Sequence, residues 1–302
     1  MRSPGSTIAR LGLAVGMAVA TASIASCSII TSLDGLTGGA TTDAAPVSPD
    51  DEGGKPEVDA SLDATSDGRA DAPPGVDASA SATYRAAVLA DAPLGYWRLD
   101  ESAGAAIATD ASGHGHDGVY ASGVTLGVAG AIAGDTAAHF DGVAANIAFG
   151  DLFRFDATTP VTIEAWVQPE VRVPADNGAI LARSLDPDGW GLYVDTSLRI
   201  AFERENATND DIITGPALAT TPFHHLVGTY DGSSLRLYYD AVLVAGPTAS
   251  GAIIGANANF FIGAVANATD LFFKGVIDEP AVYDRALTDT QIHAHYQAAR
   301  LP

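Results

Sequence analysis

From residue 84 onward, short runs of apolar or alternating residues are separated by clusters of Gly, Asp, Asn and Pro. The run VTIEAWV at residues 161–167 alternates with period two, so the two faces of a strand there would differ. One face carries Val161, Ile163, Ala165 and Val167, and the other carries Thr162, Glu164 and Trp166. Further strands are expected at residues 179–183, 189–195, 198–204, 224–230, 235–239, 259–263 and 275–283. Many short strands of this kind are typical of an all-β sandwich or barrel.

Turn and helix signals complete this pattern. Asp231-Gly232 lies between the runs HHLVGTY and SLRLYYD and predicts a hairpin, because Gly accepts the positive φ that tight connections need. Near the end of the chain, TDTQ at residues 288–291 fits a helix-capping box. Residues at helical spacing follow it: Ile292, His295, Tyr296 and Ala299. We therefore expect one short C-terminal helix to close the domain.

Residues 1–26 have the features of a signal peptide. Arg2 and Arg10 supply positive charge, and the apolar run at 11–24 is short for a membrane span. Residues 24–27, Ile-Ala-Ser-Cys, resemble the lipobox of bacterial lipoproteins, in which the cysteine is acylated and becomes the mature N-terminus. Cys27 is the only cysteine of the chain, which favours lipidation at this position. The alternative is an ordinary secretory signal with a chance cysteine nearby.

Residues 27–83 comprise the acylated cysteine and an acidic linker rich in Asp, Ala, Pro, Ser and Gly. The linker has almost no large apolar side chain to offset its ordering entropy, so it is expected to be disordered. With acyl chains on Cys27, it would tether the protein to a membrane of the bacterial cell envelope, facing the periplasm or the cell exterior. A low-affinity calcium buffer is the alternative for its Asp residues, but the rigid loop that calcium needs is not visible.

Composition places the folded domain at residues 84–302. All 3 Trp, 9 Tyr and 10 Phe lie there, and aromatic side chains bury the most area. The formal net charge is −22, and both the linker and the domain carry more Asp and Glu than Lys and Arg. Such a protein repels phosphate backbones, so a nucleic-acid partner is not expected. Divalent cations are the favoured ionic partners.

Five stretches of the domain resemble, in this order, the laminin G-like, concanavalin A-like jelly-roll superfamily: AVLADAPLGYWRLDESAG with TDASGHGHDGVY; AAHFDG; VTIEAWVQPE; FHHLVGTYDGSSLRLYYDA; and FFKGVIDEPAVYDRALTDTQIHAHYQ. The resemblance implies two antiparallel sheets packed face to face as a jelly-roll sandwich. Two positions depart from the family pattern, because Phe223 stands where a Trp is usual and Ala241 where a Gly is usual. The second departure puts the geometry of the Asp240-Ala241 turn in doubt.

The resemblance also implies a structural calcium ion where the N-terminal region meets the last strand. Its ligands in this chain would be Asp278, Asp110 and the loop at 112–115 that ends in Gly115, with Asp141 as a further candidate. Calcium takes about six to eight oxygen ligands, which Asp side chains and the carbonyls of a Gly-rich loop can supply. The alternative is that these Asp residues cap turns by accepting backbone hydrogen bonds. A zinc site is not expected, because adjacent strand residues such as His224 and His225 point to opposite faces.

No catalytic motif is recognised, so we expect a protein that is not an enzyme. Glucanases of this architecture carry Glu-x-Asp-x-x-Glu on one face of a strand, and the nearest carboxylates, Glu164, Glu203 and Glu205, do not form this pattern. A G-x-S-x-G nucleophile elbow and a phosphate-binding glycine loop are also missing from the sequence. Fold alone does not supply an activity.

Aromatic side chains could form a platform for sugar rings. Trp97 and Trp166 fall in the framework stretches and are assigned to structure, whereas Trp190 and Tyr193 border a loop and are candidate ligand contacts. Core packing is the alternative for these two residues. We therefore hypothesise a membrane-anchored, surface-displayed module that binds a glycan or a protein partner. The alternatives are a tethered glycoside-active enzyme and a purely structural envelope lipoprotein.

Overall fold

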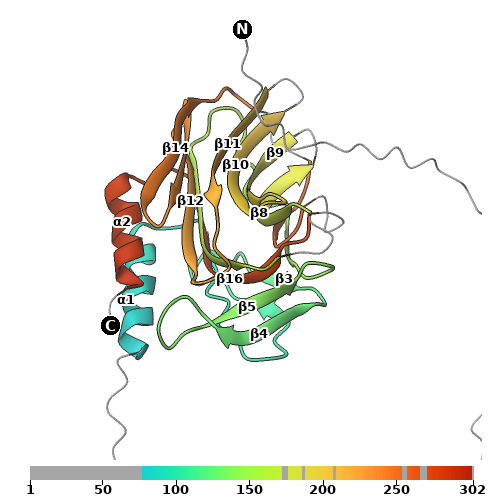
Figure 1. Cartoon of the computed structure of the whole chain (residues 1–302), viewed down its shortest axis with the longest axis vertical. Coiled ribbons are helices and arrows are strands. Elements are labelled where there is room, and N and C mark those ends of the chain that lie inside the picture. The colour runs from blue at the N-terminus through green and yellow to red at the C-terminus, as the bar shows by residue number, and fades with distance from the viewer. Residues whose placement is uncertain are drawn as a thin grey trace, which may run out of the picture. The chain divides into compact units, whose positions relative to one another are not determined.

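The structure, a computed structural model, describes residues 77–300 apart from 172–175, 186–187, 207–208, 254–256 and 266–270. The predicted signal peptide, Cys27 and most of the predicted linker lie outside these residues. Within the described residues, two antiparallel sheets of eight strands each face one another (Figure 1). The predicted fold class, an all-β two-sheet sandwich, is confirmed.

The order of the strands shows how the chain builds the two layers. The first sheet runs β14 (Val242–Ala249), β13 (Ser234–Tyr239), β12 (His224–Tyr230), β7 (Val161–Pro169), β16 (Lys274–Tyr283), β5 (Thr136–Asp141) and β4 (Val124–Ala129), with β1 (Gly95–Tyr96) also paired to β16. The second sheet runs β11 (Asn209–Ala217), β10 (Arg199–Asn206), β9 (Asp188–Val194), β8 (Gly178–Leu185), β15 (Phe260–Ile262), β6 (Ile147–Gly150), β3 (Gly118–Tyr120) and β2 (Ile107–Ala108). Because β5 and β7 lie in one sheet and β6 and β8 in the other, the chain crosses repeatedly between layers.

Strand β7 lies in the middle of the first sheet and buries both of its faces. The four residues of its predicted apolar face pack between the sheets with side chains such as Leu192 and Phe202. The opposite face, which carries Glu164 and Trp166, belongs to a second buried cluster outside the sandwich. The predicted alternation is confirmed. Alternation alone does not reveal that Glu164 is fully buried.

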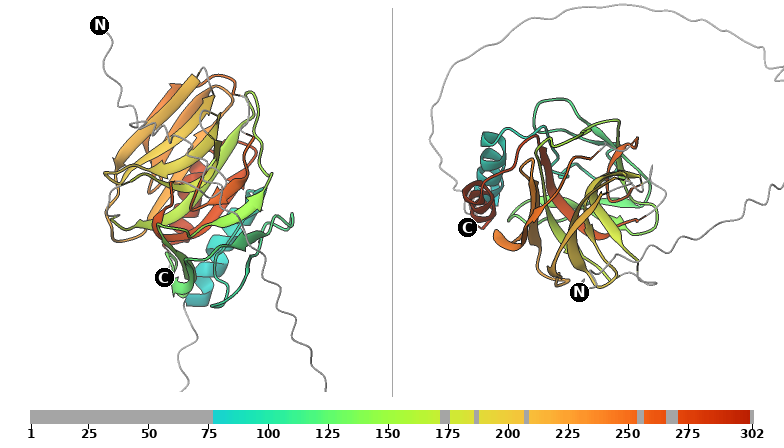
Figure 2. Two further views of the ribbon diagram at one scale, coloured as in Figure 1. Left: turned by 90° about the vertical axis from the view of Figure 1, so that its right-hand side faces the viewer. Right: turned by 90° about the horizontal axis from the view of Figure 1, so that it is seen from above.

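Two helices cover the outer face of the first sheet (Figures 1 and 2). Helix α2 (Asp289–Ala298) is the predicted one, and the capping box formed by Thr288 and Gln291 is present. Its residues Ile292 and His295 are buried against the sheet. No helix in the described part of the chain is both long and apolar enough to cross a membrane.

Helix α1 (Asp77–Ala90) differs from the prediction, which placed residues 77–83 in the linker. Its buried residues Ala80, Tyr84 and Val88 are four positions apart, so they form one stripe that packs on the sheet. Between them lie Ser, Thr and Ala residues, a composition that looks like linker. Helix α1 therefore begins seven residues before the predicted boundary of the folded domain.

Three buried side chains at one end of the second sheet hold the connection between β6 and β7. Arg183, Trp190 and Arg204 are cross-strand neighbours on β8, β9 and β10, so they share the inner face of the sheet. Their nitrogen donors lie 3.0–3.1 Å from backbone carbonyl oxygens within residues 152–157. The segment that closes this end of the sandwich is thus attached at three successive points.

The turn between β13 and β14 shows why the family favours a glycine there. Asp240 has a φ of 50° and Ala241 a φ of 63°, so both residues lie in the left-handed region. Two such residues in a two-residue connection are typical of hairpin turns that match the twist of the strands. A side chain in this conformation costs roughly 1 kcal/mol. The hairpin forms despite Ala241, and Phe223, the other departure, packs against the cluster under the helices.

The outer strands of both sheets carry features that hinder further pairing. Strand β14 contains Pro247, and β11 contains Pro216. Strand β2 has two residues, and β4 has a shift of register between Leu126 and Val128, where Gly127 has a φ of 76°. Proline, short length and bulges are the devices by which natural sheets leave their edges unpaired.

Candidate functional site

The predicted calcium ligands Asp110 and Asp141 both accept hydrogen bonds from the backbone of turns. Asp110 accepts three backbone N–H groups at 2.9–3.1 Å, two on Oδ1 and one on Oδ2. Burial alone would raise the pKa of Asp110, but these hydrogen bonds prevail and lower it. Asp141 Oδ1 accepts the N–H groups of residues 143–145 at 2.8–3.0 Å. Gly115 lies in an exposed loop with a φ of 77°.

Asp278, the remaining predicted ligand, is fully buried on β16. Its Oδ2 accepts the N–H of Ala131 at 2.7 Å, while its Oδ1 has no hydrogen-bond partner in the described part of the chain. Burial raises the pKa of Asp278 well above its usual value, which favours the neutral acid. Among the described residues, no three His, Cys, Asp or Glu side chains are grouped so that they could hold a metal ion. The residues present therefore do not fit the expected calcium ion. Asp110 and Asp141 instead cap turns by accepting backbone N–H groups.

The two predicted ligand contacts on β9 are both buried. Trp190 is 1% exposed, packs between the sheets and donates its Nε1–H to the carbonyl of Phe153 at 3.1 Å. The prediction for Trp190 is therefore wrong, because the alternation of β9 turns this side chain into the core. Tyr193 is 5% exposed, and its ring lies over Gly191, where an added Cβ would come within 2.5 Å of it. Tyr193 therefore offers little surface to a sugar ring.

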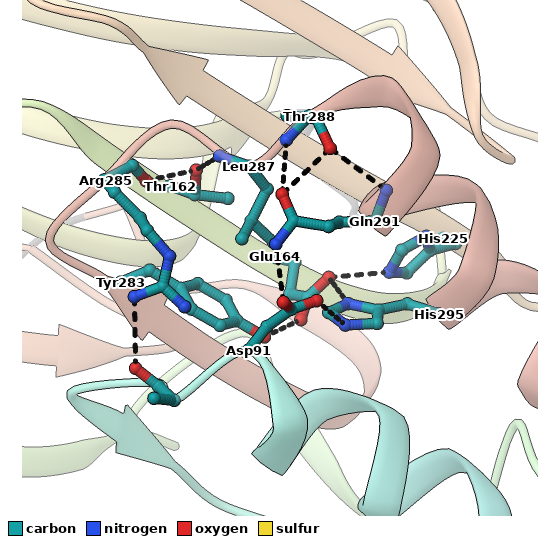
Figure 3. Close-up of polar contacts among 11 residues, drawn as sticks. Asp91, Thr162, Glu164, His225, Tyr283, Arg285, Leu287, Thr288, Gln291 and His295 are labelled. Atoms are coloured by element: carbon teal, nitrogen blue, oxygen red, sulfur yellow. Dashed lines mark hydrogen bonds and ion pairs between the residues drawn. The ribbon is translucent and has the colours of Figure 1, made fainter.

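A buried polar network joins the first sheet to both helices (Figure 3). Glu164 on β7 lies 3.2 Å from His225 Nε2 and 3.1 Å from His295 Nδ1, and it accepts the hydroxyl of Tyr283. On its other side, His295 Nε2 lies 3.1 Å from a carboxylate oxygen of Asp91, the residue that follows α1. Glu164, His225 and His295 have no exposed surface. The network thus connects β7, β12, β16, α2 and the end of α1.

The two contacts of His295 determine its protonation state. Both of its ring nitrogens face carboxylates, which accept hydrogen bonds and do not donate them when ionised, so both nitrogens carry a proton. Burial would lower the pKa of His295, but Glu164 and Asp91 outweigh it and raise the pKa to about 9. Burial would likewise raise the pKa of Glu164, but the charge of His295 and the histidine hydrogen bonds hold it well below its usual range. The network is a buried array of paired charges.

This array holds the helices on the sheet and is not accessible to a substrate. Glu164, a carboxylate considered for catalysis, lies on the face of β7 that the helices cover. A general acid or nucleophile must reach its substrate within hydrogen-bond distance. We therefore assign the Glu164 network to stability.

A pocket of about 240 Å³ opens at the end of the sandwich where β7 and β9 end and β8, β10 and β16 begin. Thr196 and Ser197 present exposed hydroxyl-bearing side chains in its wall, and Val171, Leu198 and Phe272 provide apolar surface. A concave site that combines apolar walls with a few polar groups is typical of small-ligand binding.

Side-chain carbonyl and carboxylate oxygens hold the backbone of the turn that forms the polar wall of this pocket. Asp195 Oδ1 accepts the N–H groups of Ser197 and Arg199 at 2.8 and 2.9 Å, which fixes the turn between β9 and β10. Asn177 Oδ1 accepts the N–H of Thr196 at 3.1 Å and ties this turn to the start of β8. A preformed wall limits the conformational entropy that is lost on binding.

Charged groups also line the pocket. Lys274 Nζ lies 3.4 Å from Glu170 Oε2, and Glu170 Oε1 lies 2.9 Å from His139 Nε2. Glu170 and Lys274 line the pocket and are partly exposed, so they can exchange these contacts for hydrogen bonds to a ligand. No local motif marks the pocket in the sequence, because its residues come from separate connections between strands.

A second hollow, of about 340 Å³, lies beside β3 and β4. Its lining residues, 103–105, 120–122 and 124–126, are all uncharged. The hydroxyl of Tyr120 already donates to Glu101 at 2.6 Å. With fewer groups available to orient a ligand, this hollow serves as the natural control for the first pocket.

Two facing antiparallel sheets, with helices on one of them and a pocket at one end, define a lectin-like sandwich domain. The family model "Concanavalin A-like lectin/glucanases superfamily" (Laminin_G_3) matches residues 141–293. The chain belongs to this superfamily. Among curated proteins, no sequence matches it.

Binding domains are among the solved structures with similar folds. Domain 4 of AbnA, an extracellular GH43 arabinanase from Geobacillus stearothermophilus, in complex with arabinotriose, has a TM-score of 0.51 and 20% identity over 68% of this chain and 98% of that chain. The binding domain of Paraclostridial Mosquitocidal Protein 1 has a TM-score of 0.56 and 13% identity over 69% of this chain and 52% of that chain. The botulinum neurotoxin serotype D binding domain has a TM-score of 0.54 and 12% identity over 70% of this chain and 52% of that chain. The chain spans about half the length of these two toxin domains, and identities this low show a shared fold.

Proposed function

We propose that the domain is a noncatalytic module that binds a neutral glycan in the pocket at the β9–β10 turn. The observation that carries this proposal is the pocket itself, which combines exposed hydroxyls on a hydrogen-bonded turn, apolar side chains and a Lys274–Glu170 pair. A sugar ring offers hydroxyl groups at its edge and an apolar face, so it matches both kinds of surface. An anionic polysaccharide is disfavoured, because the chain has a formal net charge of −22.

The related structures support a glycan as the ligand class. AbnA domain 4 was solved with arabinotriose, and the toxin domains are described as binding domains. Arabinotriose is therefore the first probe, followed by an array of neutral oligosaccharides.

Filling the pocket should weaken binding. Ser197 is exposed in the pocket wall, so Ser197→Trp would place an indole in the space that a sugar would use. We expect affinity for the bound oligosaccharide to fall by roughly tenfold or more, which corresponds to about 1.4 kcal/mol. Isothermal titration calorimetry measures the affinity, and the thermal midpoint should stay unchanged.

The second hollow provides the matched control for this prediction. Ser122 is also exposed and lines that hollow, so Ser122→Trp should leave binding unchanged. If only Ser122→Trp lost binding, the ligand site would instead lie in the β3–β4 hollow. Release of reducing sugar by the unmodified protein would contradict a noncatalytic role.

We also propose that the module is lipid-anchored at Cys27 in a bacterial cell envelope. The proposal rests on the lipobox-like residues 24–27 and on the single cysteine of the chain. Intact-mass analysis of protein extracted from membranes should find an N-terminus at Cys27, with its sulfur in a thioether bond to diacylglycerol. Cys27→Ala should lose this modification. A mature N-terminus elsewhere, with an unmodified cysteine, would instead indicate an ordinary secretory signal.

A further inference from the structure

Arg98 stands at the centre of an acidic cluster near the start of the domain. Its Nη2 donates to Ser81 Oγ at 2.6 Å and to Asp135 Oδ2 at 2.5 Å. Its Nη1 lies 2.6 Å from Asp100 Oδ2, and its Nε lies 3.4 Å from Glu279 Oε1. One guanidinium thus contacts three carboxylates and a hydroxyl.

These contacts come from segments that are far apart in the sequence. Ser81 belongs to α1, Asp135 directly precedes β5, and Glu279 lies in β16, the strand that ends shortly before α2. Glu279 is fully buried, has a φ of 52° and also accepts the hydroxyl of Tyr96. Arg98 therefore links the first helix, the connection before β5 and the last strand.

The cluster contains more carboxyl groups than Arg98 alone can contact. Asp278 precedes Glu279 in a stretch where the pairing of β16 with β7 shifts register, a bulge that re-aims side chains. Both residues are fully buried, and Oδ1 of Asp278 has no hydrogen-bond partner in the described chain. Loss of Arg98 would leave the buried carboxylates of Asp135 and Glu279 without the cation that contacts them in the described part of the chain.

We infer that the Arg98 guanidinium takes the place of a structural divalent cation and makes the fold independent of calcium. The expected calcium site shares Asp278 with this cluster, yet the charge that neutralises the cluster is supplied by a side chain of the chain itself. A guanidinium has five N–H donors in a fixed plane, so it can join several carboxylates at once. Arg98 thereby performs both tasks of such an ion: it balances charge and ties the chain ends together.

Thermal unfolding of the full chain, with millimolar calcium and with chelator, tests whether the fold is independent of calcium. The two midpoints of the unmodified protein should agree within about 1 °C, because no ion stabilises the native state by mass action. A midpoint that falls by several degrees in chelator would overturn the inference, since a bound ion would then carry the charge.

Substitution of Arg98 tests whether its guanidinium balances the charge of the acidic cluster. Arg98→Met should lower the midpoint of this domain by roughly 6 °C or more, because it leaves the buried carboxylates of Asp135 and Glu279 without their ion-pair partner. Arg154→Met is the matched control, since Arg154 forms an exposed pair with Asp156, and it should shift the midpoint by about 1 °C or less. Equal midpoints for the two variants would overturn the inference.

A double-substitution cycle separates charge balance from simple packing. Glu279→Gln should destabilise the unmodified protein but partly restore the Arg98→Met variant, because it then removes an unpaired carboxylate. Additive losses would show that Arg98 acts only through packing and would contradict its role as a counter-ion. If Arg98→Met does not fold, Arg98→Lys serves in its place, with a smaller loss expected because lysine keeps the charge and loses the planar donor set.

Discussion

Replacement of Glu164 by alanine is expected to lower the free energy of unfolding by about 3–5 kcal/mol, the usual cost of removing one partner from a buried ion pair. The imidazolium of His295 would lose one of its two counter-charges. The hydroxyl of Tyr283 would lose its acceptor inside an apolar layer. Both helices would then depend mainly on apolar contacts with the first sheet. Urea denaturation of the full chain, followed by circular dichroism, measures the loss.

The same network determines how stability changes with pH. The pKa of His295 is about 9 in the folded protein, against about 6.5 when unfolded, so its stabilising contribution is complete below about pH 6.5 and is lost as the pH rises through 9. The pKa of Glu164 is depressed, so its contribution is present above about pH 4.3 and is lost as the pH falls. Stability should therefore be greatest between about pH 5 and pH 7.

Two variants make this prediction specific. Glu164→Gln keeps the shape of the side chain and removes its charge, so the loss of stability between pH 7 and 10 should become smaller. Glu170→Ala removes an exposed glutamate that also contacts a histidine, and it should cost no more than about 1 kcal/mol. A Glu164→Ala protein as stable as Glu170→Ala would contradict the role assigned to the network.

Replacement of Arg204 by alanine should cost about 3 kcal/mol. Arg204 has no exposed surface, and its guanidinium lies 3.4 Å above the ring of Tyr230. It donates to Ser250 Oγ at 3.1 Å and to the carbonyls of Gly251 and Ala157 at 3.3 and 3.0 Å. Alanine would remove these three hydrogen bonds and create a cavity, although the carbonyls of Ala157 and Gly251 would keep their bonds from Ile253 N–H and the Tyr230 hydroxyl. The denaturant midpoint measures the effect.

Arg199 offers the control for this substitution on the same strand. Its side chain is only partly buried and donates to Thr214 Oγ1 at 2.8 Å, so Arg199→Ala should cost less than about 1 kcal/mol. Arg204→Met restores volume without hydrogen bonds and should recover part of the loss. If Arg204→Ala and Arg199→Ala lost equal stability, the attachment of residues 152–157 would not depend on Arg204.

Alternating and apolar runs located many of the strands that bury a face in the core, but β5 and β6, which also contribute core residues, were not among the predicted strands. Strand β7 is the clearest case, since one face meets the second sheet and the other meets the helices. Strands β4 and β11 were harder to predict, because they lie at sheet edges and many of their positions are only partly buried or exposed. Helix α1 escaped prediction because Ala and Ser surround its short apolar stripe, and only packing on the sheet distinguishes it from linker.

The site residues were less predictable than the fold. Asp110, Asp141 and Asp278 were assigned to one ion by resemblance, yet backbone N–H groups satisfy the first two, and Arg98 supplies the positive charge near the third. No spacing rule connects Arg98 to Ser81, Asp135 and Glu279, because their proximity arises from tertiary contacts. The pocket escaped prediction for the same reason. Its walls come from connections at one end of the sandwich.

The features at the sheet edges bear on how this protein behaves when many copies are crowded together. Each sandwich contains two broad sheets, and an open edge on either could template the growth of a cross-β fibril. Pro216, Pro247, the bulge at Gly127 and the two-residue strand β2 hinder such growth on all four sides. Dense arrays of the module should therefore remain separate particles, and polymerisation should require unfolding first.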